Sequence, residues 1–346
     1  MSEDGINPAH IAALLADPRF TRWRDAGFWS GETLTARFLA TVERQPDATM
    51  LVDDALELSF AAVAQRSRAL AASLAARGIG RGDALACQLP NWWEAAIVFL
   101  AAQQLGAHSV PALPILRARE FSLVLAETAP RAVFARGDSQ SLELVAEAAA
   151  LGHPGLSLLI AVRPDAALGT QDMAQKPGPE ILSFEELLSA ETSRAEVSAQ
   201  AEDLAAVIYT SGSTAAPKGA LHIQQTLVAE IDSLRAAHDL GPGDSVLMPS
   251  PLGHISGIIH GILVPALLGT SAVLQARWDP GAALRAIEKY SITYMIGAPV
   301  FLQEMLRHPS FDEHDLSSLR LFSCGGAPVP PGLLAQARER LPGLRA

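Results

Sequence analysis

One short segment of the chain, VIYTSGSTAAPKGALHI at residues 207–223, gathers the side chains that could hold an anion. Six consecutive small or hydroxylated residues run from Thr210 to Ala215, and Lys218 follows between a proline and a glycine. Backbone N–H groups of a glycine-rich turn can point into one concavity, which is a site for phosphate. Hydroxyls add rotatable donors, and a lysine adds a compact positive charge. The segment therefore indicates a phosphate-binding loop.

The spacing of this loop differs from two common nucleotide motifs. Counted from Gly212 as in a P-loop, Pro217 stands where the second glycine belongs and Gly219 where the magnesium-binding hydroxyl belongs. The segment does not follow a G-x-G-x-x-G pattern either. Because serine, threonine, glycine and proline also form solvated turns, an ordinary surface loop is the alternative that these residues leave open.

The composition of the chain restricts the classes of protein in which such a loop could occur. The chain has 346 residues, of which 49% are hydrophobic and 18% charged, as expected for a folded protein of two or three packed units. The net charge of −11, without a block of basic residues, argues against nucleic-acid binding. Two cysteines without metal-ligand spacing, Cys87 and Cys324, fit buried thiols in a reducing compartment, so we expect a cytoplasmic protein.

Strand-like and helix-like segments alternate along the chain, which predicts an α/β fold with mainly parallel sheets covered by helices. The expected strands are residues 50–52, 56–58, 84–89, 108–113, 131–135, 204–210, 219–223, 244–250, 271–276, 292–297 and 319–326. The expected helices are residues 34–42, 60–77, 92–105, 120–128, 141–151, 225–238, 254–268, 280–290, 299–307 and a last one from 331. An aperiodic segment at 163–180 predicts a loop near a junction. We therefore place a first α/β subdomain at residues 1–195 and a second, with the phosphate loop, at 196–346.

The chain offers no sign of membrane insertion or secretion. Its first ten residues, MSEDGINPAH, have neither a basic nor an apolar stretch of the kind found in signal peptides. The longest apolar tract starts at Ile258 and is interrupted by His260, Pro265 and glycines. That tract is expected to be a buried helix, a turn and a strand rather than a membrane span.

Longer stretches of the sequence resemble the adenylate-forming superfamily of acyl-CoA and aryl-acid ligases, luciferases and peptide-synthetase adenylation domains. YTSGSTAAPKG at residues 209–219 is similar to its phosphate-loop signature, except that the family usually has glycine where this chain has Ala215. If that position requires a positive φ, alanine costs on the order of 1 kcal/mol. Further similar stretches follow in the family's order at residues 81–120, 246–280 and 318–343, so the resemblance covers nearly the whole chain.

One of these stretches, and a further one near the start of the chain, indicate what kind of acid is the substrate. Within that superfamily, residues 248–269 together with 273–280 resemble bacterial ligases that act on alicyclic or medium-chain carboxylic acids. RWRDAGFWSGETL at residues 22–34 is also shared with aryl-acid adenylating enzymes. The resemblance therefore indicates the class of reaction more clearly than it indicates which carboxylic acid is the substrate.

The resemblance implies that a small carboxylic acid attacks the α-phosphorus of ATP, releasing pyrophosphate, and that the acyl group then passes from AMP to a thiol, usually that of coenzyme A. ATP, Mg²⁺ and coenzyme A are the implied cofactors, and Lys218 and His254 are the implied catalytic residues. The departing pyrophosphate would be held by Thr210, Ser211, Gly212, Ser213, Thr214, Lys218 and Gly219. No metal ligand can be named.

Two further sites follow from the same resemblance, each with a plainer alternative. His254 matches a family histidine that lies beside the carboxylate and acyl chain. Without the resemblance, the local sequence favours a core histidine at a helix start whose hydrogen bonds are satisfied within the protein. Gly325, Gly326, Ala327 and Pro328 match a turn against which adenine and the acyl group lie, and an ordinary strand-to-helix turn is the alternative.

The chain ends before the positions of the family's adenine-binding Tyr-Gly-x-Thr-Glu segment, its ribose-binding aspartate, its hinge and its mobile C-terminal lid domain with a catalytic lysine. We therefore expect the chain to be part of a longer acyl-CoA ligase and to have little or no adenylating activity alone. An aryl-acid AMP ligase that delivers to a carrier protein and a non-catalytic nucleotide-binding remnant are the alternatives. The oligomeric state stays open, with a homodimer as one alternative.

Overall fold

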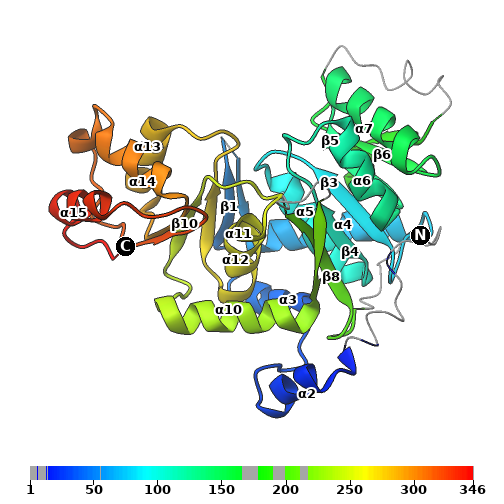
Figure 1. The fold of residues 1–346 in the computed structure, drawn as a ribbon, viewed down its shortest axis with the longest axis horizontal. Coiled ribbons are helices and arrows are strands. Elements are labelled where there is room, and N and C mark those ends of the chain that lie inside the picture. Colours follow the sequence, from blue (N-terminus) through cyan, green and yellow to red (C-terminus); the bar gives the residue numbers. More distant parts are fainter. Residues whose placement is uncertain are drawn as a thin grey trace. The chain divides into compact units, whose positions relative to one another are not determined.

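The computed structural model describes residues 6, 13, 15–54, 56–165, 178–189, 199–210 and 217–345. Its elements form two compact α/β units (Figure 1). Unit 1 comprises Met1–Leu39, Ala62–Leu89 and Glu94–Glu230, and unit 2 comprises Ala40–Ala61, Pro90–Trp93 and Ile231–Ala346. Two α/β units with mainly parallel sheets were predicted, and the structure confirms them.

Unit 1 contains a seven-stranded sheet with the order β7-β6-β5-β3-β4-β8-β9. Its strands are β3 (Ala84–Gln88), β4 (His108–Pro111), β5 (Ala132–Arg136), β6 (Leu158–Val162), β7 (Glu180–Ser183), β8 (Leu204–Thr210) and β9 (Lys218–Ile223). The pairs are parallel except β8 with β9. Strands β3, β4 and β6 are buried along their whole length, as expected for parallel strands with helices on both faces.

Unit 1 also contains helices, several of which supply its core. Its helices are α2 (Pro18–Asp25), α3 (Leu34–Arg44), which continues into unit 2, α4 (Phe60–Ala75), which begins in unit 2, α5 (Trp93–Leu105), α6 (Ala118–Thr128), α7 (Ser139–Gly152) and α9 (Phe184–Ser189). Helices α6 and α7 lie side by side next to β5 and β6 (Figure 1). Their apolar faces supply Phe121 and Val145 to a cluster with Val133 and Leu159 of the sheet. Twelve consecutive residues of α5 are buried, so this helix lies in the interior.

Unit 2 contains a six-stranded sheet with the order β13-β12-β10-β11-β1-β2. Its strands are β1 (Thr49–Asp53), β2 (Leu56–Ser59), β10 (Ser245–Met248), β11 (Ser271–Leu274), β12 (Tyr294–Gly297) and β13 (Leu321–Cys324). The pairs are parallel except the hairpin of β1 and β2. Strands β10, β12 and β13 therefore end at one edge of the sheet, where open α/β sheets bind ligands.

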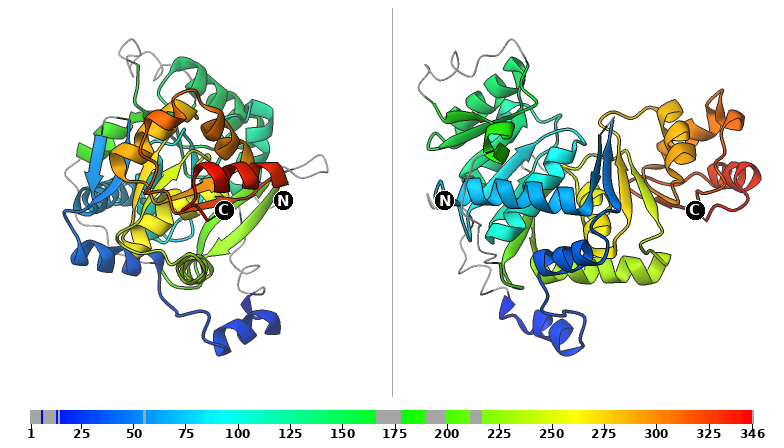
Figure 2. Two further views of the ribbon diagram at one scale, coloured as in Figure 1. Left: turned by 90° about the vertical axis from the view of Figure 1, so that its left-hand side faces the viewer. Right: turned by 180° about the vertical axis from the view of Figure 1, so that it is seen from behind.

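The helices of unit 2 pack on this sheet. They are α10 (Gln224–His238), which begins in unit 1, α11 (Ile255–Gly257), α12 (Val264–Leu268), α13 (Pro280–Tyr290), α14 (Pro299–Arg307) and α15 (Pro331–Arg340), with a 3₁₀ turn at Phe311–Glu313. Helices α13, α14 and α15 pack one beside the next (Figure 2). Leu284, Leu302 and Leu333 of these helices share a core cluster with Met295 and Phe322 of the sheet.

The division between the units differs from the predicted boundary at residue 195. Strands β8 and β9 belong to the sheet of unit 1, because β8 pairs in parallel with β4. Residues 40–61 belong to unit 2, because β1 pairs in parallel with β11. Both assignments depend on pairing between strands far apart in the sequence, which the alternation of strands and helices does not specify.

The apolar tract from Ile258 forms the predicted helix, turn and strand. Residues Ile258–Leu263 are a π-helical turn between α11 and α12, and a left-handed Gly269 with φ 81° ends the helix before β11. A side-chain amide N–H of Gln45 donates to the carbonyl of Gly269 at 2.8 Å, which caps this helix end. In the described ranges, no helix has the length and apolarity needed to cross a membrane.

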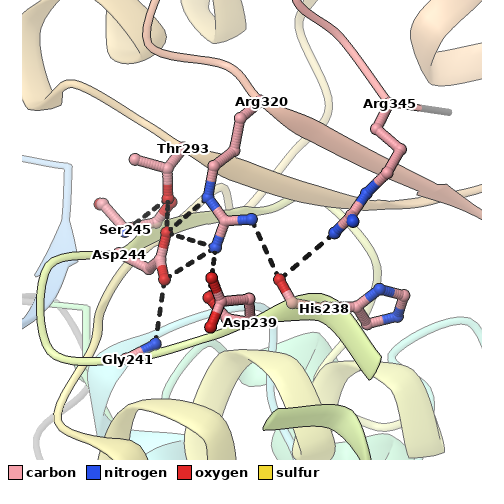
Figure 3. Close-up of polar contacts among 8 residues, drawn as sticks. All are labelled: His238, Asp239, Gly241, Asp244, Ser245, Thr293, Arg320 and Arg345. Carbon is pink, nitrogen blue, oxygen red and sulfur yellow. Dashed lines mark hydrogen bonds and ion pairs between the residues drawn. The ribbon is translucent and has the colours of Figure 1, made fainter. Parts of the chain in front are cut away.

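A polar network joins the amino ends of β10, β12 and β13 to the end of α10 (Figure 3). The Arg320 guanidinium donates to both carboxylate oxygens of Asp244 at 2.9 Å and to the carbonyls of His238 and Asp239. The Thr293 hydroxyl donates to the same carboxylate at 2.6 Å. The network fixes the strand ends opposite to the edge where ligands bind in such sheets.

We expect the Asp244 carboxylate to make the stability of unit 2 sensitive to acid. Burial raises the pKa of Asp244. Hydrogen bonds from Arg320, Thr293 and the Gly241 N–H together lower it by more, so the pKa lies below the ordinary value for an aspartate. Stability from this group is therefore present above the unfolded pKa, about 3.9, and is lost as the pH falls through the folded pKa. Asp244→Asn should lower the free energy of unfolding at neutral pH and flatten its decline below about pH 4. Urea denaturation across this range measures both effects.

Asp312→Asn is the matched control, because Asp312 also pairs with an arginine, Arg340, but its side chain is 83% exposed. Exposed ion pairs contribute less than about 1 kcal/mol, so this variant should resemble the wild type. An acid profile for Asp244→Asn that parallels the wild type would contradict the role of the network.

Candidate functional site

The two ends of the predicted phosphate loop lie opposite each other in the hairpin of β8 and β9. Thr210 is the last residue of β8 and pairs with Lys218, the first residue of β9. Both side chains are exposed at the end of this hairpin. The intervening predicted residues, Ser211, Gly212, Ser213, Thr214 and Ala215, lie outside the described residues. The hairpin therefore presents the Lys218 ammonium to solvent beside the last residue of β8.

Gly219 has a steric role in this hairpin. A Cβ atom on Gly219 would lie 2.9 Å from Cγ1 of Val207 and 3.2 Å from Cζ of Tyr209. Gly219 is not among the residues with positive φ, so its backbone angles do not require glycine. The aromatic ring of its cross-strand partner Tyr209 occupies the space that a side chain would need.

Tyr209 is anchored by Glu127, a residue that no local sequence pattern singles out. Its hydroxyl donates to a carboxylate oxygen of Glu127 on α6 at 2.9 Å. Burial, and then the Glu127 carboxylate, raise the pKa of Tyr209 well above its ordinary value, so the hydroxyl stays protonated and can donate. Glu127 therefore ties the ring, and with it the hairpin, to a helix of unit 1.

Gly219→Ala is expected to displace the hairpin. The added methyl overlaps a valine methyl and the anchored Tyr209 ring, and such overpacking typically costs about 1–3 kcal/mol. We expect a lower melting temperature and a weaker phosphate site. Ala220→Ser, on the exposed neighbouring position, is the control and should change neither. Wild-type stability in Gly219→Ala would show that the ring moves aside freely.

His254 lies between β10 and α11, where it caps the helix. Its Nδ1 accepts the N–H of Ser256 at 3.3 Å and lies 3.0 Å from the Ser256 hydroxyl. Because Nδ1 accepts, the neutral ring carries its proton on Nε2, which can donate to a ligand. The prediction of a helix start is confirmed, but the imidazole is exposed and is not a core histidine.

The core histidine of this helical segment is His260. Its Nδ1 lies 2.6 Å from the hydroxyl of the buried Tyr294, and only 4% of the residue is exposed. Burial lowers the pKa of His260 to about 3, so the ring is neutral and accepts the Tyr294 proton. This pair joins the π-helical turn to β12 and leaves His254 as the histidine that faces solvent.

Residues 325–328 form an exposed turn after β13. The N–H of Gly325 donates to the carbonyl of Gly297 at 3.0 Å, and Gly326 has φ 80°, which favours glycine. A Cβ atom on either Gly325 or Gly326 would meet none of the described residues within 4 Å. The backbone here is therefore open to a ligand. His254 follows β10 and this turn follows β13, so unit 2 brings both to the same edge of its sheet.

Other candidate groups do not point to chemistry. Burial raises the pKa of the Cys87 thiol to about 12 and also raises that of the half-buried Cys324, so neither is an activated nucleophile. In the part of the chain that the structure describes, no three His, Cys, Asp or Glu side chains are grouped to hold a metal ion. Trp278 packs on Phe301 with ring centroids 4.7 Å apart.

Comparison with known proteins identifies the family to which this chain belongs. The family model described as AMP-binding enzyme matches residues 38–346. This chain belongs to the AMP-binding enzyme family. The predicted resemblance to adenylate-forming enzymes is thereby confirmed.

Curated relatives of this AMP-binding enzyme include acyl-CoA ligases. A medium-chain fatty-acid–CoA ligase of Escherichia coli (strain K12) is 30% identical over 334 residues, which are 95% of this chain and 57% of the ligase. A feruloyl-CoA synthase of Amycolatopsis sp is 29% identical over 299 residues, which are 85% of this chain and 54% of the synthase. The chain thus spans about half the length of the curated relatives it matches.

Solved structures show the same fold. The apo structure of Mycobacterium smegmatis MbtA superposes with a TM-score of 0.81 at 24% identity, covering 94% of this chain and 58% of that one. The anthranilate CoA ligase AuaEII, in complex with anthranoyl-AMP, superposes with a TM-score of 0.77 at 20% identity, covering 90% and 58%. These likenesses confirm the predicted α/β architecture of the AMP-binding enzyme.

Proposed function

We propose that the whole protein is an AMP-forming acyl-CoA ligase. It would join a carboxylic acid to the α-phosphorus of ATP with release of pyrophosphate, and then transfer the acyl group to the thiol of coenzyme A with release of AMP. Because this chain spans about half of its curated relatives, the proposal concerns the product of the complete reading frame. The observation that carries it is the exposed Lys218 opposite Thr210 at the end of the β8–β9 hairpin, within a match to the AMP-binding family.

Lys218 would stabilise the pyrophosphate as it leaves. Negative charge grows on the β- and γ-phosphates during adenylation, and catalysis of such transfers depends mainly on electrostatic stabilisation and positioning. An exposed ammonium at a fixed strand end suits that task because its position is set by pairing with Thr210. The roles of Ser211, Gly212, Ser213 and Thr214 as further donors stay predictions.

His254 and the turn at residues 325–328 would receive the organic parts of the substrates. The Nε2–H of His254, which bonds to none of the residues that the structure describes, can donate to a carboxylate oxygen of the acid while Nδ1 keeps its bond to Ser256. The exposed backbone of Gly325, Gly326, Ala327 and Pro328 would lie against adenine and the acyl group. We assign His254 to orienting the carboxylate for attack, which is a matter of geometry more than of proton transfer.

ATP, Mg²⁺ and coenzyme A are the cofactors of the proposed reaction. Mg²⁺ usually binds through one or two carboxylates together with substrate phosphates and water, so here it would arrive with the nucleotide. Bound in that way, the ion would neutralise phosphate charge. Thr210 offers a hydroxyl at the hairpin end. A homodimeric state and a cytoplasmic location stay predictions.

An acid panel with the product of the complete reading frame tests the proposal. Medium-chain, alicyclic and aryl acids are offered with ATP, and coenzyme A or a carrier protein is supplied separately, with products read by mass spectrometry. We expect an acyl-CoA from a medium-chain or alicyclic acid. Products found only on the carrier protein would favour the aryl-acid alternative, and no adenylate from any acid would favour a non-catalytic remnant.

A further inference from the structure

A buried asparagine braces the segment that leads from β10 to His254. Asn91 belongs to the short stretch Pro90–Trp93, which is part of unit 2 although both of its flanks belong to unit 1. Only 3% of Asn91 is exposed. Its Nδ2 donates to the carbonyls of Met248 at 3.2 Å and Ser250 at 2.8 Å, and its Oδ1 accepts the N–H of Leu252 at 2.8 Å.

These three bonds answer a local need of the chain. The segment after β10 reads Pro249, Ser250, Pro251, so two of its residues have no N–H and cannot continue a strand ladder. The Ser250 carbonyl and the Leu252 N–H belong to buried residues, where an unpaired polar group costs free energy. A primary amide offers two donors and one acceptor in one plane, which is the set used here.

The braced segment leads directly into the His254 cap. The N–H of His254 donates to the carbonyl of Pro251 at 3.0 Å. The helix then packs against the same residue, because a Cβ atom on Gly257 would lie 2.1 Å from the Pro251 oxygen. A shift of residues 248–252 therefore moves both the backbone of His254 and the first turn of the helix that it caps.

We propose that Asn91 is a positioning residue for His254 in the adenylation step. This inference rests on the proposed function, in which His254 orients the acid. Asn91 acts through the backbone at residues 248–252 and touches neither substrate. Its loss should therefore affect the use of the acid far more than the binding of ATP.

The first test compares Asn91→Ala with Gln45→Ala in the product of the complete reading frame. Both variants remove one side-chain amide bound to backbone in unit 2, and Gln45 caps the other end of the same helical segment, at Gly269. Asn91→Ala should lower kcat/KM for the acid about tenfold to a hundredfold, as expected for a small displacement of an orienting group, with KM for ATP nearly unchanged. Gln45→Ala should leave both parameters close to wild type. Equal losses in the two variants would reduce Asn91 to a general structural role.

A double-mutant cycle with His254→Ala separates positioning from stability. If Asn91 acts through His254, then Asn91→Ala should cause little further loss of kcat/KM in the His254→Ala protein. Additive losses would overturn the proposal. Asn91→Asp serves as a second variant: its carboxylate would face two carbonyl oxygens, so it should be at least as impaired as Asn91→Ala.

Hydrogen exchange of residues 248–256, followed by mass spectrometry, gives a readout that does not depend on activity. Exchange of the Leu252 amide region should become faster in Asn91→Ala and stay unchanged in Gln45→Ala. A protein that forms no adenylate at all would remove the proposed function. An active protein whose exchange in this region is unchanged by Asn91→Ala would remove only the Asn91 brace.

Discussion

Lys218→Ala in the product of the complete reading frame is expected to slow ATP–pyrophosphate exchange about 10²- to 10³-fold. This is the range seen when one group that stabilises transition-state charge is removed. The side chain is exposed at the first position of β9, so its truncation should leave the melting temperature close to wild type. Isotope exchange with saturating acid measures the effect on the adenylation step itself.

Two further variants make this result specific. Lys218→Arg keeps the charge but replaces a compact ammonium by a broad planar group, so it should recover only part of the rate. Lys289→Ala removes a lysine of α13 whose ammonium bonds to Tyr290, and it should retain the wild-type rate. Exchange at the wild-type rate in Lys218→Ala would take this lysine out of the mechanism.

Gly257→Ala is expected to have the largest effect on unit 2. The new Cβ atom would lie 2.1 Å from the oxygen and 2.6 Å from the carbon of the Pro251 carbonyl, and both are backbone atoms that cannot rotate away. Either the start of α11 or the braced segment before it must move. We expect a loss of at least about 1–3 kcal/mol in the free energy of unfolding, together with impaired use of the acid. Alanine is otherwise the better helix former, so propensity alone predicts the opposite sign.

Gly243→Ala is the control for this change. Gly243 lies in unit 2 before β10 and does not have a positive φ, and a Cβ atom added to it would have no neighbour within 4 Å among the residues that the structure describes. Its replacement should therefore be nearly neutral. Calorimetry and the exchange assay on both variants test the comparison, and a Gly257→Ala protein with wild-type melting would contradict the close packing described here.

Local patterns predicted most elements of this fold. Strand 84–89 and helix 141–151 were expected from periodicity and turn residues, and the structure has β3 at Ala84–Gln88 and α7 at Ser139–Gly152. The sheet to which each strand belongs was harder to predict, because it depends on pairs of residues far apart in the sequence, such as Ser109 with Ala206. Such pairing is decided by tertiary packing, so the alternation of strands and helices does not show why the compact units divide elsewhere than at residue 195.

In the candidate site, too, residues within local motifs were predicted, and residues that act from a distance in the sequence were not. Lys218 and His254 were predicted because they belong to compact motifs, whereas Glu127 and Asn91 act on residues 82 and about 160 positions away. Neither has a local signal that distinguishes it from an ordinary polar residue. The sequence also offered two histidines in one helical segment, and only burial separates the exposed His254 from the buried His260.

The central claim is that the β8–β9 hairpin holds the phosphates of ATP. A crystal structure of the complete protein with ATP and Mg²⁺ tests it most directly. We predict phosphate oxygens within about 3 Å of the Lys218 ammonium, at charge-assisted hydrogen-bond distance. A triphosphate bound elsewhere, with the Lys218 side chain pointing into solvent, would contradict the claim.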